Sequence, residues 1–330
     1  MRGRKIYLHL IYKYMKIFIT GIAGAIGSHM AERLLKEGHE VVGIDALTPY
    51  YSPEIKKINL SDVEASGAKV FIRDLVTDDI QELLRDVDFI FHFAAQPGIS
   101  ASTSFEEYLR NNIVATEKLL QAARRTSSLK GFIHASTSSV YGAFAGGDEE
   151  TVPKPTSYYG VTKLAAEQLA LSYGRDKGLP VTALRFFSVY GERERPEKLY
   201  HKLIKAVLEE KEFTIYKGAE KHIRSYTYVS DIIDGCMLVL QNFEKAKGEI
   251  FNLGNDKTMT TGEGIELIQE IIGKRAKLIE LPPRSGDQLE TSANISKMQN
   301  TFGYSPKVQL KEGLTAEVEW FKNKLWNKDL

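Results

Sequence analysis

Residues 16–45, KIFITGIAGAIGSHMAERLLKEGHEVVGID, decide the fold of this chain. They show the pattern of a strand, a turn with glycines at G-x-x-G-x-x-G spacing, a helix, and a second strand that ends in an acid. Gly21 allows a sharp turn, Gly24 lets backbone amides approach a ligand, and Gly27 lets the helix pack close to the sheet. The amino terminus of such a helix presents unpaired N–H groups that favour a pyrophosphate. The segment therefore predicts a bound dinucleotide.

Asp45 makes this glycine pattern informative. The chain has 26 Gly in 330 residues, and three glycines at one fixed spacing should arise by chance in roughly a sixth of such chains. An ordinary strand-to-helix turn is the plain alternative. Asp45 lies 18 positions after Gly27, at the end of an apolar strand. A carboxylate there accepts both hydroxyls of an adenosine ribose and repels a 2′-phosphate, so we expect NAD and not NADP.

Length and composition restrict the classes of protein to which this chain can belong. A chain of 330 residues suits one large domain with a smaller partner. The formal charge of +1 provides no broad basic surface for nucleic acid or anionic lipid. A single cysteine, Cys236, rules out an internal disulfide and fits a reducing compartment, so we expect a cytoplasmic protein. The seven histidines have no metal-ligand spacing, and we expect no metal site.

The first 14 residues, MRGRKIYLHLIYKY, stand apart from this pattern. Lysines interrupt the apolar run, and the segment leads into the first strand without a cleavage site, unlike a signal peptide. No stretch of the chain approaches the ~18 apolar residues that span a membrane. Because Met15 directly precedes the strand, we interpret it as the natural start and residues 1–14 as an extension. An extra edge strand or arm is the alternative.

Strands and helices alternate along most of the chain. Helical patterns cover residues 80–84, 105–125 and 158–177. Apolar runs that indicate parallel strands separate them, at residues 17–19, 41–44, 70–72, 89–93, 132–135 and 181–186. This alternation predicts an α/β fold, a doubly wound parallel (Rossmann) sheet with a smaller C-terminal α/β substrate cap.

The rhythm changes after about residue 191 and sets the predicted domain boundaries. We expect a helix over residues 199–209, a strand over 213–216, a helix around 231–240, a strand over 250–253, and two helices after Pro282. The resulting division assigns residues 15–190 and 226–257 to the NAD-binding Rossmann domain, and residues 191–225 and 258–330 to the cap. Binding in such folds occurs at the carboxyl ends of the strands, here between sheet and cap.

Tyr159 and Lys163 form a Y-x-x-x-K pair. On a helix their side chains lie one turn apart on the same face. An ammonium near a phenol favours the phenolate, so we expect the pKa of Tyr159 to be lowered toward that of a general base. The spacing alone is weak evidence, because two other Tyr–Lys pairs of the chain share it.

A run of hydroxyl side chains distinguishes this pair from the other two. In residues 132–142, FIHASTSSVYG, four consecutive hydroxyl side chains, at positions 136–139, lie at the carboxyl end of a buried strand. A solvated loop is the plain alternative, but apolar segments flank the run on both sides. A hydroxyl of this run can bridge a substrate oxygen and Tyr159.

At this point the chain resembles the extended short-chain dehydrogenase/reductase family, specifically its nucleotide-sugar epimerases and dehydratases. The resemblance runs from residue 16 nearly to the C-terminus. It rests on the order of GIAGAIGSH (21–29), Asp45, RDL (73–75), HFAAQ (92–96), NN (111–112), STSSVYG (136–142), YYGVTK (158–163), LRFFSVYG (184–191), RSYTYVSD (224–231) and RSGD (284–287).

The resemblance implies a role for each matching residue. It makes Thr137, Tyr159 and Lys163 catalytic, with Lys163 also holding the nicotinamide ribose. It implies a diphosphate clamp by Arg224 and Arg284, forked donors suited to that task, although a surface salt bridge is the plain alternative for each. It places Asp287 at the nucleoside ribose. The implied NAD contacts are Gly21, Gly24, Ala25, Ile26, Gly27, Asp45, Asp74, Leu75, Ala94, Ala95, Asn112, Tyr159 and Lys163.

Two serines narrow the reaction within this family. Dehydrating members carry an Asp-Glu pair after the Thr, and UDP-glucuronate decarboxylases carry a Glu just before the Val. This chain has Ser138 and Ser139 there. Without the extra acid, the resemblance implies reversible oxidation at C4 of a UDP-sugar, which is epimerisation with NAD⁺ regenerated in each cycle.

Further likeness points to the UDP-glucuronate 4-epimerases. Segments 45–57 and 186–204 match patterns of that group, and Ser188 with Ser138 and Ser139 can hold a carboxylate that Arg195 also approaches. Against this, Ile99 and Ser100 stand where many glucuronate epimerases have Val-Arg. UDP-glucose or UDP-N-acetylglucosamine is therefore the main alternative substrate. A decarboxylase and a non-catalytic NAD sensor are further alternatives.

The resemblance also implies an assembly. In similar proteins two helices of each subunit pair with those of a second subunit as a four-helix bundle. Here these are the predicted helices over residues 105–125 and 158–177. We therefore expect a homodimer.

Overall fold

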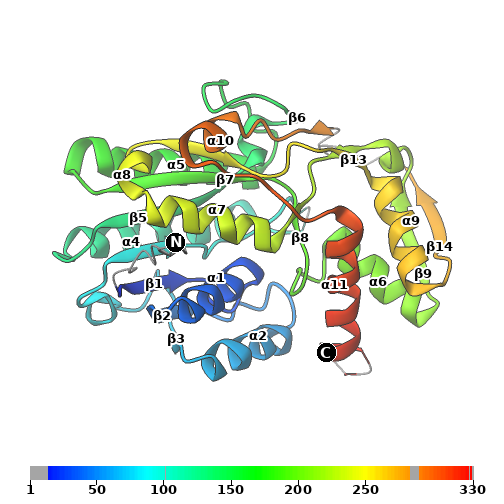
Figure 1. The fold of residues 1–330 in the computed structure, drawn as a ribbon, viewed down its shortest axis with the longest axis horizontal. Coiled ribbons are helices and arrows are strands. Elements are labelled where there is room, and N and C mark those ends of the chain that lie inside the picture. Colours follow the sequence, from blue (N-terminus) through cyan, green and yellow to red (C-terminus); the bar gives the residue numbers. More distant parts are fainter. Residues whose placement is uncertain (1–13, 101, 283–289, 327, 329–330) are drawn as a thin grey trace, which may run out of the picture.

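A parallel sheet of seven strands forms the centre of the computed structural model, which describes residues 14–100, 102–282, 290–326 and 328. The predicted α/β class is confirmed, and Figure 1 shows helices packed against this sheet with a separate helical group beside it. The strand order is β12-β7-β5-β4-β1-β2-β3. The strands are β1 (Lys16–Thr20), β2 (Glu40–Asp45), β3 (Lys69–Ile72), β4 (Phe89–His92), β5 (Gly131–Thr137), β7 (Val181–Phe186) and β12 (Ile250–Leu253).

The strand order reverses at β1, which pairs with β2 on one side and β4 on the other. Ile17, Phe18 and Ile19 are fully buried, as expected for a central strand covered on both faces. Successive side chains point to opposite faces, so Ile17 and Ile19 enter one hydrophobic cluster and Phe18 the other. The reversal opens a crevice at the carboxyl end of β1, where such sheets bind ligands.

Helices cover both faces of the sheet. One cluster of apolar side chains joins the sheet to α1 (Ala25–Lys36) and α7 (Val229–Gln241). The cluster on the other face joins it to α4 (Ala115–Arg124) and α5 (Tyr158–Lys177). The Ser157 side chain caps α5 by accepting from the Gly160 N–H. The predicted helix at residues 158–177 therefore has the bounds that were expected.

The expected helix over residues 105–125 is interrupted. It consists of α3 (Phe105–Tyr108), a π-helical segment at Leu109–Val114, and α4. Ser104 and Glu107 form a capping box that starts it. Residues 80–84, expected as helical, form a short 3₁₀ turn at Gln81–Leu84.

The cap has its own core. It contains α6 (Leu199–Glu209), α9 (Thr261–Ile272), α11 (Leu310–Lys324), and a parallel pair of strands, β9 (Glu212–Tyr216) and β14 (Lys277–Leu281). Leu203, Ile268 and Leu314 are completely buried where the three helices meet. In Figure 1 this group lies to the right of the large sheet.

One helix of the C-terminal region packs elsewhere. Residues 293–304, which the sequence analysis grouped with the cap, include α10 (Ser296–Phe302). Met298 and Tyr304 are buried in the cluster that covers the large sheet beside α7 and β12. Figure 1 shows α10 above the large sheet, whereas α11 lies with the other helices of the cap. A short helix with few apolar positions does not reveal its packing partner in the sequence.

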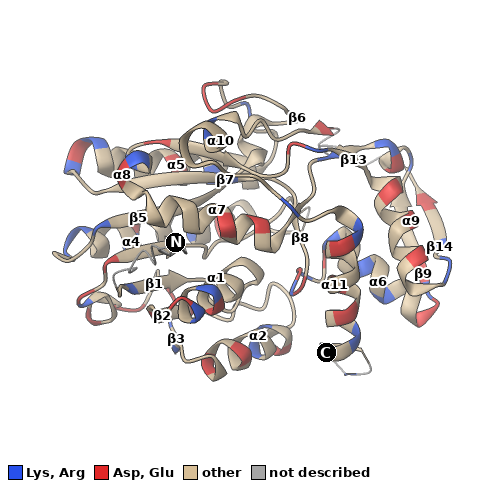
Figure 2. Ribbon diagram, viewed as in Figure 1, with Lys and Arg blue, Asp and Glu red and all other residues tan. Residues whose placement is uncertain are grey.

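Charges are mixed over the described surface. Figure 2 shows acidic and basic residues along the same exposed helices, including α11. This mixture agrees with the formal charge of +1. Within the described residues, no helix is long and apolar enough to cross a membrane.

Candidate active site

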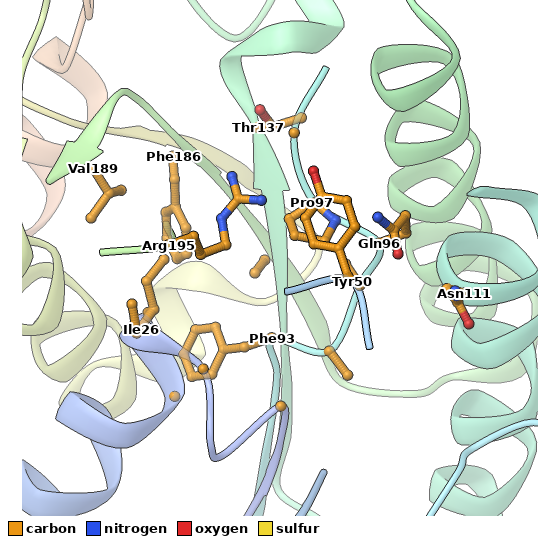
Figure 3. A pocket seen from close by; sticks show the side chains of 18 of the residues that line it. Ile26, Tyr50, Phe93, Gln96, Pro97, Asn111, Thr137, Phe186, Val189 and Arg195 are labelled. Atoms are coloured by element: carbon orange, nitrogen blue, oxygen red, sulfur yellow. The ribbon is translucent and has the colours of Figure 1, made fainter. Parts of the chain in front are cut away.

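A cavity lies at the carboxyl ends of the central strands, between the large sheet and the cap. Figure 3 shows Thr137 at the end of a strand, with Arg195 and Tyr50 directed into the cavity. Of the predicted site residues, the structure brings the following to its wall: Gly21, Gly24, Ala25, Ile26, Gly27, Asp45, Asp74, Leu75, Ala94, Ala95, Thr137, Ser138, Ser139, Tyr159, Lys163, Ser188 and Arg195.

The glycine turn has no room for side chains. Gly21 adopts a φ of 72°, and a Cβ on it would lie 2.8 Å from the Ala94 backbone nitrogen. A Cβ on Gly27 would lie 2.2 Å from the Gly21 carbonyl oxygen. Gly24 caps α1 without a side-chain hydrogen bond, so the first N–H groups of the helix face the cavity. The residues present therefore fit a pyrophosphate held by backbone amides.

Asp45 ends β2 at the edge of this cavity. Its carboxylate accepts from the Ala23 N–H at 3.2 Å and from the Leu47 N–H at 2.8 Å. These two bonds fix the carboxylate beside the glycine turn and leave it further lone pairs for ribose hydroxyls. Asp74 lines the same region and is paired with Arg110 at 2.7 Å.

The hydroxyl run and α5 meet at the other end of the cavity. Thr137 ends β5 and caps a 3₁₀ turn, accepting from the Ser139 N–H at 3.2 Å. Its side chain also hydrogen-bonds Tyr159. Lys163 donates from Nζ to the Ala135 carbonyl oxygen at 2.6 Å. The structure thus brings together the three side chains predicted as catalytic.

The pKa of Tyr159 differs from the sequence-based expectation. Burial raises it, while the Thr137 hydrogen bond and the charge of Arg195 act in the opposite direction. The expected lowering by Lys163 is therefore wrong for this structure, because the ammonium is directed at the strand backbone. Burial lowers the pKa of Lys163 to about 8, against the opposing effect of Glu167.

The Arg195 side chain lies directly against Gly98 in the cavity wall. A Cβ built on Gly98 would lie 3.2 Å from a guanidinium nitrogen of Arg195, so the guanidinium lies beside the segment that lacks the family's usual arginine. Arg195 pairs with Glu197 at 2.5 Å and lies over the Tyr50 ring at 6.0 Å. Ser188 faces the same cavity from a backbone with a φ of 23°.

Of the described site residues, Asn112 and Arg224 are not brought to the cavity wall. Asn112 is buried behind it, where its amide bonds the backbone of Gln96, and the neighbouring Asn111 lines the cavity instead. Arg224 lies in β10 (Ile223–Arg224), half-buried and away from the described lining. Arg284 and Asp287 lie outside the described residues.

The cavity also contains residues that sequence reasoning missed. Tyr50, Tyr51 and Lys56 come from the segment after β2, and Lys56 lies over the Tyr51 ring at 4.9 Å. Burial raises the pKa of Tyr50 to about 12, so its phenol stays protonated at neutral pH. The pair of tyrosines shortly after Asp45 was visible as a family pattern, but the pattern alone does not show which side chains of the segment face the cavity.

The fold and cavity define a dinucleotide-binding enzyme of the short-chain dehydrogenase/reductase type. Residues 17–254 match the family model described as the NAD dependent epimerase/dehydratase family. The chain belongs to this family, as the sequence analysis predicted, and its cofactor is NAD.

Relatives with similar overall structure include sugar-nucleotide epimerases. The chain is 40% identical to the uncharacterized UDP-glucose epimerase YtcB of Bacillus subtilis, over 94% of this chain and 98% of that protein. It is 33% identical to UDP-glucuronate 4-epimerase 6 of Arabidopsis thaliana, over 93% of this chain and 71% of that protein. A crystal structure of UDP-glucuronic acid 4-epimerase from Bacillus cereus, in complex with UDP-glucuronic acid and NAD, matches with a TM-score of 0.89 and 38% identity, over 94% and 99% of the two chains.

Proposed function

We propose that this protein is an NAD-dependent 4-epimerase that converts UDP-glucuronate to UDP-galacturonate through a 4-keto intermediate. The observation that carries the proposal is the cavity end shared by Tyr159, Thr137 and Arg195, with serines in place of the acids that dehydration or decarboxylation needs. The named glucuronate epimerases among the relatives support the same substrate.

The glycine turn, Asp45 and the Lys163 end of the cavity together hold the cofactor. The backbone amides of the turn bind its pyrophosphate, and Asp45 binds the adenosine ribose. Lys163 binds the nicotinamide ribose. Bound NAD⁺ supplies a hydride acceptor for C4 and a positive ring near the site. The remaining cofactor contacts are those predicted from the sequence, with Asn112 acting through the backbone of Gln96.

Tyr159 is the general base in this proposal. Its phenol is buried and hydrogen-bonded to Thr137. A C4 hydroxyl that lies beside both side chains can therefore pass its proton to the Tyr159 oxygen, directly or through the Thr137 hydroxyl. In the return step Tyr159 gives the proton back to the C4 oxygen. The raised pKa of the unliganded phenol keeps it protonated until positive charge is brought close to it.

Arg195 and three serines of the cavity prevent decarboxylation of the 4-keto intermediate in this proposal. A 4-keto uronate is a β-keto acid and loses CO₂ when the bond to its carboxylate aligns with the carbonyl π system. Hydrogen bonds from Ser138, Ser139 and Ser188, with the Arg195 charge nearby, hold the carboxylate out of that alignment. The segment Ile99-Ser100 lacks a cation, and Arg195 supplies one beside the adjoining Gly98.

A neutral substrate is the second candidate. The relative from Bacillus subtilis carries the name of a UDP-glucose epimerase, and Ser100 in place of arginine removes one charge from the sugar end. The paired guanidinium of Arg195 favours the uronate, because a neutral C6 hydroxyl needs no cation. A decarboxylase lacks support because Ser139 stands directly before Val140, where the decarboxylases carry a glutamate. A non-catalytic NAD sensor would not need the Tyr159–Thr137 contact.

The cap contacts belong to the same proposal. We assign the diphosphate to Arg224 and Arg284 and the nucleoside ribose to Asp287, on the strength of their motifs. The domain division is likewise proposed, with the NAD-binding residues in 15–190 and 226–257. The cytoplasmic location is proposed on the single cysteine, Cys236, which is buried.

A homodimer completes the proposal. Phe105, Leu109, Tyr158 and Val161 are large apolar residues exposed on α3, the adjoining π segment and α5. The rings of Phe105 and Tyr158 pack edge to face at 5.3 Å, so the two helices present one continuous apolar face. A second copy of this face would cover it as a four-helix bundle.

The test is separate incubation with UDP-glucuronate, UDP-glucose and UDP-N-acetylglucosamine, followed by NMR. We expect UDP-galacturonate from the first and much slower turnover of the other two. Conversion of UDP-glucose without UDP-glucuronate would overturn the uronate assignment. Formation of a UDP-pentose would show a decarboxylase instead.

A further inference from the structure

A buried ion pair lies next to the proposed catalytic helix. Arg185 of β7 is 1% exposed and Glu167 of α5 is 0% exposed. The Arg185 guanidinium donates to both carboxylate oxygens of Glu167, from Nε at 2.8 Å and from Nη2 at 2.7 Å. Such a two-bond contact fixes the orientation of both side chains. The reaction outlined above uses neither residue.

Further hydrogen bonds tie this pair to the strands around it. Ser136 of β5 donates from Oγ to the Glu167 carboxylate at 2.7 Å. Arg185 also donates to the Tyr141 hydroxyl at 2.8 Å, which in turn donates to the Asn252 side chain of β12 at 2.8 Å. The network therefore joins α5 to β5, β7 and β12.

Glu167 continues the stripe formed by the proposed catalytic residues. Tyr159, Lys163 and Glu167 lie one turn apart on the same face of α5. Each contacts the carboxyl end of β5: Tyr159 bonds the Thr137 side chain, Lys163 bonds the Ala135 carbonyl, and Glu167 bonds Ser136. Three successive helical turns are thus attached to three consecutive residues of one strand.

We propose that Glu167, held by Arg185, is a positioning residue for the reaction: its carboxylate fixes α5 against the end of β5 and places a negative charge one helical turn from the Lys163 ammonium. This inference rests on the proposed function, because it assigns Glu167 a role through Lys163.

The charges around Lys163 support this role. Burial lowers the pKa of His92 in β4 to about 3 and lowers the pKa of His134 in β5 well below its usual value, so both imidazoles are neutral. Tyr159 is neutral as well, because burial raises the pKa of its phenol. Among the titratable groups that face Lys163 from α5, β4, β5 and β7, Glu167 supplies the negative charge, and it also offsets Arg185.

The sign of the expected effect follows from this arrangement. Burial already lowers the pKa of Lys163 to about 8, and Glu167 opposes that lowering. Glu167→Gln removes the opposing charge, so Lys163 should lose its proton at lower pH than in the wild type. The pH at which turnover falls on the alkaline side should be lower by the same amount, because the reaction uses the charged ammonium.

The test is an NMR titration of Lys163 in the full chain, labelled with ¹³C at the lysine Cε atoms. The signal is assigned by its absence from Lys163→Met. We expect a midpoint at about pH 8 in the wild type, and a midpoint lower by about half a pH unit or more in Glu167→Gln. Asp88→Asn is the matched control, since Asp88 pairs with Lys130 at the opposite end of the sheet. It should leave the midpoint unchanged.

The double variant Glu167→Gln/Arg185→Met keeps the test valid if the single variant fails to fold, because it removes both members of the buried ion pair and does not leave the Arg185 guanidinium without its carboxylate. Its midpoint should also lie below that of the wild type. An unchanged midpoint in the single variant, or a wild-type midpoint in the double variant, would overturn the role of Glu167. If the midpoints shift as expected but the wild type converts no UDP-sugar, the proposed function fails and the control of Lys163 by Glu167 stands.

Discussion

At the residue scale, the reactive end of the cavity combines a protonated phenol with a partly desolvated ammonium. Tyr159 is buried beside Thr137, and Lys163 is directed at the backbone of β5. In the proposed reaction, proton transfer at C4 depends on Tyr159 through a short-range contact, and on Lys163 through the charge that it brings to the site. The two side chains have separable effects.

Tyr159→Phe tests the general base. It removes the proton acceptor and keeps the ring, so kcat should fall by roughly 10²–10⁴-fold while NAD binding is retained. Initial rates by NMR and cofactor content of the purified protein measure both. Tyr158→Phe, at the exposed neighbour, is the control and should leave kcat within about two-fold. Full activity in Tyr159→Phe would exclude the proposed base.

Arg195→Gln tests the carboxylate contact. Loss of a charge-assisted hydrogen bond costs about 1.5–3 kcal/mol, so kcat/KM for UDP-glucuronate should fall by roughly 10–100-fold. Turnover of UDP-glucose should change much less, since its C6 group is neutral. Arg175→Gln, at an exposed position near the end of α5, provides the comparison. Equal losses for both sugars would show that Arg195 does not select the uronate.

Much of this site was predictable from residue types in order. The glycine turn, Asp45, the hydroxyl run and the Tyr-Lys pair occur in short motifs whose spacing reflects local geometry. The pKa of Tyr159 was not predictable, because it depends on where the Lys163 ammonium points in three dimensions. Asn112 was placed at the cofactor although it lies one layer behind, which no linear pattern distinguishes from Asn111.

At the element scale, the turn from β1 into α1 sets the position of the cofactor. The Gly21 carbonyl lies where a Cβ on Gly27 would be, so the helix can approach the turn only without that side chain. Periodicity predicted the seven strands of the sheet, because each is an apolar run bounded by polar residues. The same signal predicted the cap strand over residues 213–216, which the structure shows as β9. The π-helical segment carries no such signal, since its hydrogen bonds depend on tertiary neighbours.

Gly27→Ala tests this turn. The added Cβ would lie 2.2 Å from the Gly21 oxygen, so the backbone must shift. We expect a loss of stability of about 1–3 kcal/mol and much weaker NAD binding. Thermal unfolding and cofactor titration measure the two effects. At Gly146 a Cβ meets nothing within 4 Å, so Gly146→Ala is a control that should change neither. Wild-type NAD affinity in Gly27→Ala would contradict the assigned turn.

At the scale of the whole molecule, the apolar face of α3 and α5 should determine the assembly. Val161 is 44% exposed on this face, and Val152 is 69% exposed in a separate loop. A carboxylate at position 161 would have to be buried without a partner in the proposed four-helix bundle.

Val161→Glu should therefore shift the protein from dimer to monomer, whereas Val152→Glu should remain dimeric. Analytical ultracentrifugation at micromolar concentration distinguishes the two states. A wild-type monomer, or a Val161→Glu dimer as stable as the wild type, would exclude this face as the subunit interface.

The measurement that tests the central claim most directly is proton NMR of UDP-glucuronate incubated with the protein in D₂O. The account predicts UDP-galacturonate that keeps protium at C4, because a hydride returned from a bound cofactor does not exchange with solvent. No external redox partner should be needed. Deuterium at C4, or the absence of UDP-galacturonate, would contradict epimerisation by reversible oxidation at that carbon.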